Sequence, residues 1–388
     1  MRLLGLIALA LIMGVHAKAD KLLKIEVTDT NNYQTTTLHH PANLTAQPDT
    51  ALNCYVSERV TFRHQDEPQL FIEVMDWVAS QWQHDGFNQP PRDMTSLEIL
   101  KNVHENGERY RCVEYGKVMA DILSSMGHYS RQIGLRSVDA AYGGWGRGHV
   151  ATEVWSNTLD KWVFFDPQYS IYAVHQGEYL NIDDIHRLKA RGMFESIDYV
   201  VTPEFAAAND LDVEETLEGY AGFLNNYLGC HTSGRDLGNG PIGIHYLMET
   251  DTPALTFQGM GSGAPVICTR EAELAYPKLN QTVVAMAAQA RQDVDFMTIM
   301  EEHGIETEEQ FLEHMWRFAA EGVVVVSLSS NMVDLEKYQI RIDGGKWVDH
   351  DSEDFEWTLN EGQNRFEVRS MSSGGVPGPV TFVEVTFE

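Results

Sequence analysis

The sequence predicts an α+β fold followed by a second unit made mostly of strands. In residues 66–190, apolar residues at helical spacing come first, and strand-like runs joined by turns come after them. Near residue 253 the composition becomes strand-like, and Asp-Gly, Glu-Gly and Gly-Pro turns separate the runs that follow. We therefore expect a helix-and-sheet core over residues 66–200 and a β-sandwich over residues 253–388.

The first nineteen residues have the pattern of a signal peptide. Arg2 precedes an apolar run that ends at Ala17-Lys18-Ala19, which matches an A-x-A cleavage site. The run is shorter than the roughly 20 apolar residues that a membrane-spanning helix needs. We expect cleavage before Asp20 and a soluble, secreted or periplasmic protein with no membrane span. Residues 20–65 mix short β-like runs with polar turns and are predicted to form an N-terminal extension.

The chain is strongly acidic, with 57 Asp and Glu residues against 28 Lys and Arg residues and a formal net charge of -29. Such a surface repels nucleic acids and anionic membranes, so neither is an expected partner. A negative charge also serves solubility, and on its own it names no partner. No feature of the sequence specifies an oligomeric state.

Three helices are expected at the start of the core. The first covers the run "PQLFIEVMDWVASQWQHDG", and the second starts near Thr95 and closes at Gly107. The third starts at Cys112 and ends at Gly127. Its apolar residues fall three and four apart, which is typical of a buried helix: Tyr115, Val118, Met119, Ile122, Leu123 and Met126.

Strands are expected after these helices. "YSRQIGLRS" is followed by the glycine-rich bend "YGGWGRG" and then by "HVATEVWS" and "KWVFFD", which are joined by a turn around Asn157 and Asp160. Residues 201–252 carry some helical signal before they become rich in loops, and we interpret them as a connecting segment. A helical insertion is expected near residues 290–320, where Thr307 and Gln310 match a capping box.

The chain has only four cysteines, too few for a disulfide-built scaffold. Cys230 and Cys268 flank glycine-rich loops and are candidates for a structural disulfide. Cys112 differs because it lies in the first turn of a predicted helix, where unpaired N–H groups and the helix dipole favour a thiolate. A thiolate that acts as a nucleophile also needs a base and a group that orients the base.

His149 and Asp166 are the candidates for base and orienter. If their strands pair across a turn near residue 158, Asp166 lies opposite His149 or within one residue of it. Opposed residues project from the same face with Cβ atoms about 5 Å apart, which lets a carboxylate hold an imidazole. A slip of one residue would place them on opposite faces, so this prediction depends on the strand register.

The order and context of these residues resemble the bacterial transglutaminase-like family. The motifs are "GERYRCVEYGKVMADILSSMG", "R-x-IGL", "GHVATEVWS" and "KWVFFDPQYSIY", and "YLNIDDIHRL" fits the segment that usually follows. The resemblance covers roughly residues 70–190 and implies a papain-like α+β core. It implies that Cys112 is the nucleophile, His149 the general base and then acid, and Asp166 the orienter.

The implied chemistry is acyl transfer through a thioester, with an amide of a peptide or polymer as substrate and water or an amine as acceptor. The resemblance also implies an oxyanion hole made by the backbone N–H of Cys112 and by a side chain upstream of it. Gln81, Trp82 and Gln83 all remain candidates for that side chain. The sequence departs from the family at Tyr110 and Arg111, where a small residue is common. No calcium-binding loop is evident, and no cofactor is expected.

Other interpretations stay open for several residues. Cys112 could be a buried structural thiol, and Tyr142 and Trp145 beside the glycines could line a substrate cleft or pack in a core. Glu153 shares a strand face with His149, and we expect a surface pairing for it. The histidines lack the spacing of a zinc site, so no metal is expected.

Two further functions remain possible for the whole chain. It could be a non-catalytic adhesion or assembly module that binds a surface polymer, or an enzyme that uses carboxylates in residues 190–330 on polysaccharides. No paired-carboxylate motif in those residues is distinctive. The C-terminal strands resemble the immunoglobulin-like or fibronectin-like modules attached to exported enzymes.

Overall fold

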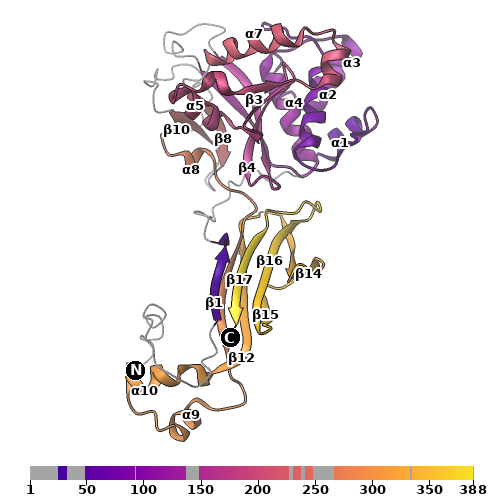
Figure 1. Cartoon of the computed structure of the whole chain (residues 1–388). Coiled ribbons are helices and arrows are strands. Elements are labelled where there is room, and N and C mark those ends of the chain that lie inside the picture. The colour runs from indigo at the N-terminus through magenta and orange to yellow at the C-terminus, as the bar shows by residue number, and fades with distance from the viewer. Residues whose placement is uncertain are drawn as a thin grey trace.

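The computed structural model describes residues 25–32, 49–91, 93–136, 148–226, 230–236, 241–247, 266–332 and 334–387. Figure 1 shows two bodies: helices and a large sheet in the upper part, and the C-terminal strands below. The predicted signal peptide and the candidates Tyr142 and Trp145 lie outside the described residues. Within the described ranges, none of the helices has both the length and the apolar character that crossing a bilayer requires.

Four helices precede the sheet of the upper body: α1 (Thr50–Ser57), α2 (Gln69–Ala79), α3 (Ser96–Asn106) and α4 (Cys112–Ser125). Helix α3 starts at a capping box of Thr95 and Glu98, and it ends at Gly107, whose φ of 69° suits glycine. Helix α4 starts at Cys112, as predicted. The apolar faces of these helices share one core with strand residues, including Phe71, Val74, Leu100, Val118, Ile122 and Phe165.

The large sheet contains β2 (Ser130–Arg136), β3 (Gly148–Ser156), β4 (Lys161–Asp166), β5 (Ile171–His175), β6 (Glu178–Tyr179), β7 (Asp198–Val200), β8 (Cys230–Asp236), β9 (Pro241–Leu247) and β10 (Val266–Thr269). Its strand order is β10-β9-β8-β2-β3-β4-β5-β6, and β7 pairs with β5. Helix α4 lies against β2 and β3. At Gly116 a Cβ atom would lie 3.1 Å from the carbonyl oxygen of Ala151, so glycine permits this close approach. The described part of the upper body is therefore α+β.

The core extends further along the chain than the sequence predicted. Strands β8, β9 and β10 come from the predicted connecting segment and from the start of the predicted β-sandwich, yet they belong to the large sheet because β8 pairs with the edge of β2. The helical elements α5 (Ile182–Ala190), η5 (Phe194–Ser196), α6 (Pro203–Ala208), α7 (Val213–Asn225) and α8 (Ala272–Ala275) occupy the same part of the chain. Several of them share a core with the sheet through Ile185, Ala206, Tyr220, Leu224 and Ala275.

The lower body consists of two sheets. One has the order β1-β17-β16-β13-β14 and the other β11-β12-β15. The strands are β1 (Ile25–Thr30), β11 (Thr282–Ala290), β12 (Ala319–Ser330), β13 (Leu335–Ile342), β14 (Val348–His350), β15 (Asp354–Thr358), β16 (Gly362–Ser372) and β17 (Thr381–Phe387). Both sheets bury side chains in one core, including Val284, Val326, Trp357, Ile340, Phe366 and Val385. Two sheets sharing one core form a sandwich, while its immunoglobulin-like identity stays a prediction.

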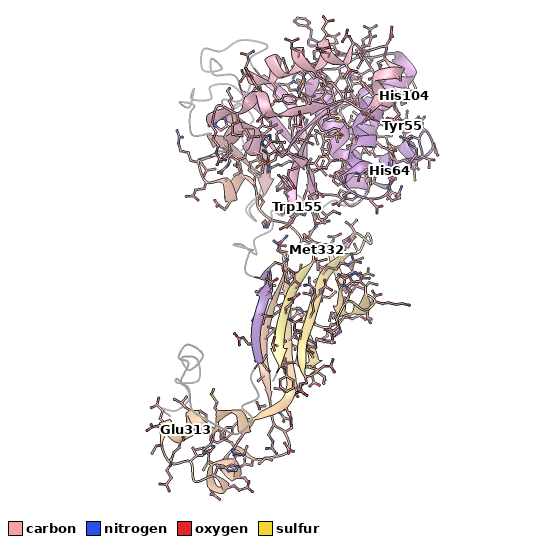
Figure 2. The ribbon with its side chains drawn as sticks, viewed as in Figure 1. Tyr55, His64, His104, Trp155, Glu313 and Met332 are labelled. Atoms are coloured by element: carbon pink, nitrogen blue, oxygen red, sulfur yellow. The ribbon has the colours of Figure 1, made fainter. Side chains whose placement is uncertain are left out.

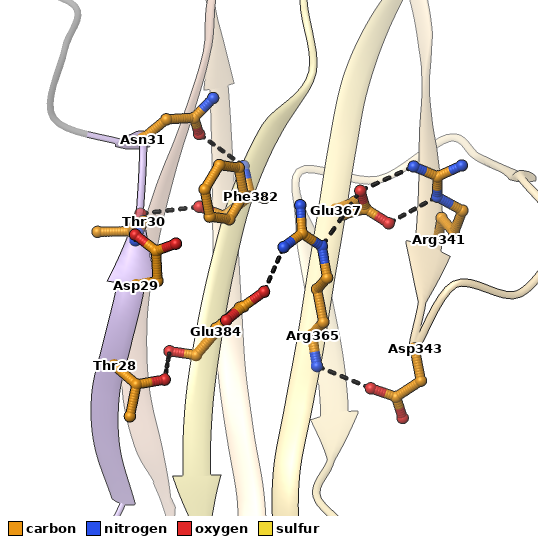
Figure 3. Close-up of polar contacts among 10 residues, drawn as sticks. All are labelled: Thr28, Asp29, Thr30, Asn31, Arg341, Asp343, Arg365, Glu367, Phe382 and Glu384. Carbon is orange, nitrogen blue, oxygen red and sulfur yellow. Dashed lines mark hydrogen bonds and ion pairs between the residues drawn. The ribbon is translucent and has the colours of Figure 1, made fainter.

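The predicted N-terminal extension does not form a unit of its own. Its strand β1 pairs with β17 near the other end of the chain, while α1 packs on the helices of the upper body. Figure 3 shows β1 beside β17, where the Thr30 hydroxyl donates to the carbonyl of Phe382 at 2.8 Å. Without β1, one edge of β17 would have unpaired backbone groups. That edge and the apolar core of the sandwich together explain why these distant residues come together.

Two helices and a 3-10 turn separate β11 from β12, at the far end of the sandwich in Figure 1. They are α9 (Phe296–Glu302), α10 (Glu308–His314) and η6 (Met315–Phe318). The Thr307 and Gln310 capping box is present at the start of α10.

The two bodies contact each other through residues just before β2, β4, β11 and β13. The Tyr129 hydroxyl donates to Asp334 at 3.2 Å, and the side-chain amide of Gln281 donates to Asp160 at 2.8 Å. Trp155 and Trp162 pack with Leu279 beside these bonds. Figure 2 shows Trp155 at the lower end of the upper body.

Candidate active site

Cys112 is the first residue of α4. Arg111 precedes it in an extended conformation, and the Glu114 side chain accepts the backbone N–H of Arg111 at 3.1 Å and its guanidinium at 2.9 Å. These bonds fix the first turn of the helix. Cys112 is a free thiol and is partly buried. The structure therefore places this sulfur at a helix start and leaves it unbridged.

His149 on β3 contacts the Cys112 sulfur through its ring. The Nε2 atom of His149 lies 2.7 Å from Oδ2 of Asp166, which leaves Nδ1 as the ring nitrogen for the sulfur. The His149 side chain is almost fully buried. The three residues that the sequence singled out thus form one chain of contacts: sulfur, imidazole, carboxylate.

Asp166 lies two residues from the position opposite His149, whereas the prediction placed it opposite His149 or within one residue of it. Strands β3 and β4 pair Thr152 with Phe165 and Ser156 with Lys161. Extending this pairing by one residue places Asp166 opposite Ala151, and therefore diagonal to His149. A diagonal neighbour lies on the same face within reach of a long side chain. Because the shift is even, both side chains keep a common face and the hydrogen bond still forms.

The Asp166 carboxylate is fully buried and accepts two further hydrogen bonds. The Tyr220 hydroxyl donates to Oδ2 at 2.9 Å, and the backbone N–H of Gln168 donates to Oδ1 at 3.1 Å. Tyr220 lies on α7, 54 residues after Asp166. Burial, reinforced by the charge of Asp166, raises the pKa of Tyr220 well above its ordinary value, so its phenol remains a donor. Sequence reasoning missed this residue, because its segment showed only a helical pattern.

Aromatic rings cover the far side of His149. Phe223 on α7 packs its ring edge-to-face against the imidazole at 5.2 Å, and the ring of Tyr169 lies 6.0 Å away. Tyr220 packs against Tyr169 in turn. These rings exclude water from the imidazole and its carboxylate, which strengthens the electrostatic interaction between them.

The contacts shift the pKa values of the thiol and the imidazole in opposite directions. Burial alone would raise the pKa of Cys112, but hydrogen bonds from His149 and His84, the charge of His149 and the Val150 N–H lower it to about 6. Burial alone would lower the pKa of His149, but the charge and hydrogen bond of Asp166 together with Cys112 raise it to about 10. Near neutral pH the pair is therefore a thiolate and an imidazolium.

Two of the three upstream oxyanion candidates, Gln81 and Trp82, have polar atoms that are engaged or enclosed in this conformation. The amide nitrogen of Gln81 donates to the Trp77 carbonyl at 2.5 Å, and its oxygen accepts from His104 at 2.9 Å, so its polar atoms are engaged elsewhere. The ring of Trp82 stacks on Tyr115 in the core. Its indole N–H is enclosed and has no hydrogen-bond partner among the described residues, so a substrate oxygen cannot reach it without a rearrangement.

His84 is a contact of Cys112 that the sequence analysis did not identify. It lies in the irregular segment after α2, is exposed, and hydrogen-bonds to the sulfur. A lone histidine in a polar segment carries no sequence signal for this position. Only the fold brings it to Cys112.

The predicted disulfide between Cys230 and Cys268 is wrong. Strand β9 lies between the strands that carry them: Cys230 pairs with Leu247 and Cys268 with His245, both on β9. Strands two places apart in a sheet are separated by about 10 Å, beyond the roughly 7 Å that a disulfide spans between Cα atoms.

Glu153 is buried, contrary to the predicted surface pairing. It bonds to Arg131 at 2.6 Å, to the Tyr276 hydroxyl at 3.0 Å and to the Ile182 backbone N–H at 3.0 Å. These bonds tie α8 and the start of α5 to the sheet. Among the residues that the structure describes, no group of three or more His, Cys, Asp or Glu side chains is arranged to hold a metal ion.

Comparison with solved structures finds the transglutaminase of red sea bream. The TM-score is 0.24 and the sequence identity 10%, over 89% of this chain and 72% of that chain. A likeness this low carries no weight for fold or function. Neither a protein-family model nor a curated protein matches the chain.

Proposed function

We propose that this protein is an exported thiol enzyme that transfers acyl groups from amide bonds of peptides or cell-surface polymers. The observation that carries the proposal is the contact chain from the Cys112 sulfur through His149 to the buried carboxylate of Asp166. A nucleophile, a base and an orienter in contact are the arrangement that thiol acyl transfer needs. Export rests on the signal-peptide pattern of residues 1–19.

In the acylation step the Cys112 thiolate attacks the amide carbonyl carbon. The new S–C bond pushes the carbonyl electron pair onto oxygen, and the backbone N–H of Cys112, in the first turn of the helix, donates to that oxygen. As the intermediate collapses, the His149 imidazolium gives its proton to the departing amine. Asp166 holds the imidazolium in place and does not itself take the proton.

In the second step water or an amine attacks the thioester. Neutral His149 removes a proton from the attacking group, the S–C bond breaks, and the thiolate and imidazolium are restored. Water gives hydrolysis and an amine gives an isopeptide bond. The same residues serve both outcomes, so the acceptor defines the reaction class.

The test is a product analysis with matched cysteine variants. The chain from residue 20 onward is incubated with a mixed peptide library and a labelled primary amine, and the products are identified by mass spectrometry. We expect hydrolysed or amine-labelled peptides, and we expect Cys112→Ala to form neither while it stays folded. Cys54→Ala is the control, because Cys54 is also a free thiol but is exposed on α1. Tight peptide capture by Cys112→Ala with no product from the parent protein would instead indicate a binding module.

A further inference from the structure

The segment that carries His84 is fastened to the start of α4 at three points. The Tyr115 hydroxyl donates to the Trp82 carbonyl at 2.5 Å, and the Asp85 backbone N–H donates to the Tyr110 carbonyl at 2.9 Å. The Asn88 side chain donates to the carbonyl of Arg109 at 2.7 Å. These bonds lie on both sides of His84 and hold its backbone beside Cys112.

Two histidines contact the same sulfur from different surroundings. His149 is buried under α7 and tied to Asp166, so its ring is committed to proton transfer. The ring of His84 also hydrogen-bonds to the sulfur. His84 is exposed to solvent, whereas aromatic rings pack against His149.

We infer that His84 is a fourth catalytic residue, whose ring N–H donates to the oxyanion of the tetrahedral intermediate. The inference rests on the proposed function. In that intermediate the oxygen is two bonds from the sulfur, so a donor that contacts the sulfur reaches the oxygen after a small rotation of the ring.

The negative charge moves from the sulfur to the carbonyl oxygen during attack, and this movement explains why His84 suits the role of oxyanion donor. Before attack, hydrogen bonds from the His84 side chain and the Val150 backbone N–H stabilise the negative sulfur and lower the pKa of Cys112. When the S–C bond forms, the negative charge moves to the carbonyl oxygen, and the His84 donor follows it. The proton stays on His84 throughout, and the electron pair returns to the C–O bond when the leaving group departs. Gln81 and Trp82 do not compete, because one is engaged elsewhere and the other is enclosed.

The experiment separates oxyanion stabilisation from simple activation of the thiol. Acylation is followed with p-nitrophenyl acetate, which passes through an oxyanion, and alkylation with iodoacetamide, which does not. Both rates are measured at pH 8, above the pKa of Cys112, for the parent protein, His84→Ala, His84→Gln and the surface control His64→Ala. His64 is a suitable control because it pairs with Glu73 on the surface of α2.

We expect His84→Ala to lower the acylation rate about 100-fold while alkylation changes less than about three-fold. His84→Gln keeps an N–H donor and should recover at least ten-fold of the loss. His64→Ala should behave as the parent. If His84→Ala lost acylation and alkylation equally, or lost no acylation, the role of His84 would be overturned and the proposed function would stand. Failure of the parent protein to acylate Cys112 would overturn the proposed function and this inference with it.

Discussion

Strand β3 contributes one residue to each of two buried ion pairs, and the two pairs differ in what they contact. His149 with Asp166 lies at the start of the strand, and Glu153 with Arg131 lies four residues further along it. Every side chain of both pairs is buried, but only His149 also touches a reactive sulfur. The Arg131 and Glu153 side chains end on a backbone carbonyl, a phenol and a backbone N–H, all from elements that they fasten together. Under the proposed function, equal burial serves chemistry at one end of the strand and stability at the other.

The largest expected effect comes from breaking the first pair. Asp166→Asn keeps the size of the side chain but removes the charge that holds the imidazolium, so we expect kcat to fall by about 10³-fold or more. Since the neutral amide retains hydrogen-bonding atoms, the folded fraction should stay high. Steady-state kinetics and a circular dichroism melt on the same sample check this. A fall in activity that matches the loss of folded protein would contradict the catalytic role.

The second pair should give the opposite pattern. Glu153→Gln leaves Arg131 buried without a counter-charge, which should lower the free energy of unfolding by about 3 to 5 kcal/mol. Activity per folded molecule should change little, because Glu153 has no contact with Cys112 among its hydrogen bonds. Urea unfolding with active-site titration separates the two quantities. If Glu153→Gln instead abolished turnover in the folded protein, the two ends of β3 would not be functionally distinct.

The protonation states of Cys112 and His149 predict a bell-shaped pH dependence. The rate of acyl transfer should rise through pH about 6, where Cys112 loses its proton. It should fall through pH about 10, where His149 loses its proton. These limbs belong to the coupled pair as a whole. Iodoacetamide alkylation from pH 4 to 11 measures the acid limb directly. An ordinary thiol midpoint near 8.5 would show that the contacts do not activate the sulfur.

Tyr220 tests the role of the His149–Asp166 pair from outside it. Its hydroxyl donates to Asp166, so we expect it to act on His149 only through that carboxylate. Tyr220→Phe removes one of the three hydrogen bonds on the carboxylate, and we expect kcat to fall up to about ten-fold with KM unchanged. Without the phenol, more of the carboxylate charge acts on His149, so the alkaline limb should move to higher pH. A lower melting temperature with an unmoved pH profile would mean that Tyr220 has only a structural role.

The sequence predicted the positions of Cys112, His149 and Asp166 better than the surroundings of these residues. The start of α4 at Cys112 and the strand positions of His149 and Asp166 follow from local patterns that need no tertiary information. The residues that were missed, His84 and Tyr220, reach the site from an irregular segment and from a helix beyond the recognised motifs. Strands β8 to β10 were assigned elsewhere because loop-rich residues separate them and edge pairing is decided by the whole sheet. The wrong disulfide had the same cause, since cysteine spacing does not reveal an intervening strand.

The smallest expected effect lies in the sandwich, in the partly exposed ion pair of Arg365 and Glu384. Figure 3 shows Arg365 between Glu367 and Glu384, with Arg341 on the other side of Glu367. Arg365 and Glu384 are both about one-third exposed, so water screens their attraction. Glu384→Gln should therefore change the free energy of unfolding by less than about 1 kcal/mol and leave turnover unchanged. A loss as large as that expected for Glu153→Gln, measured by the same urea titration, would mean that burial does not decide what an ion pair contributes in this protein.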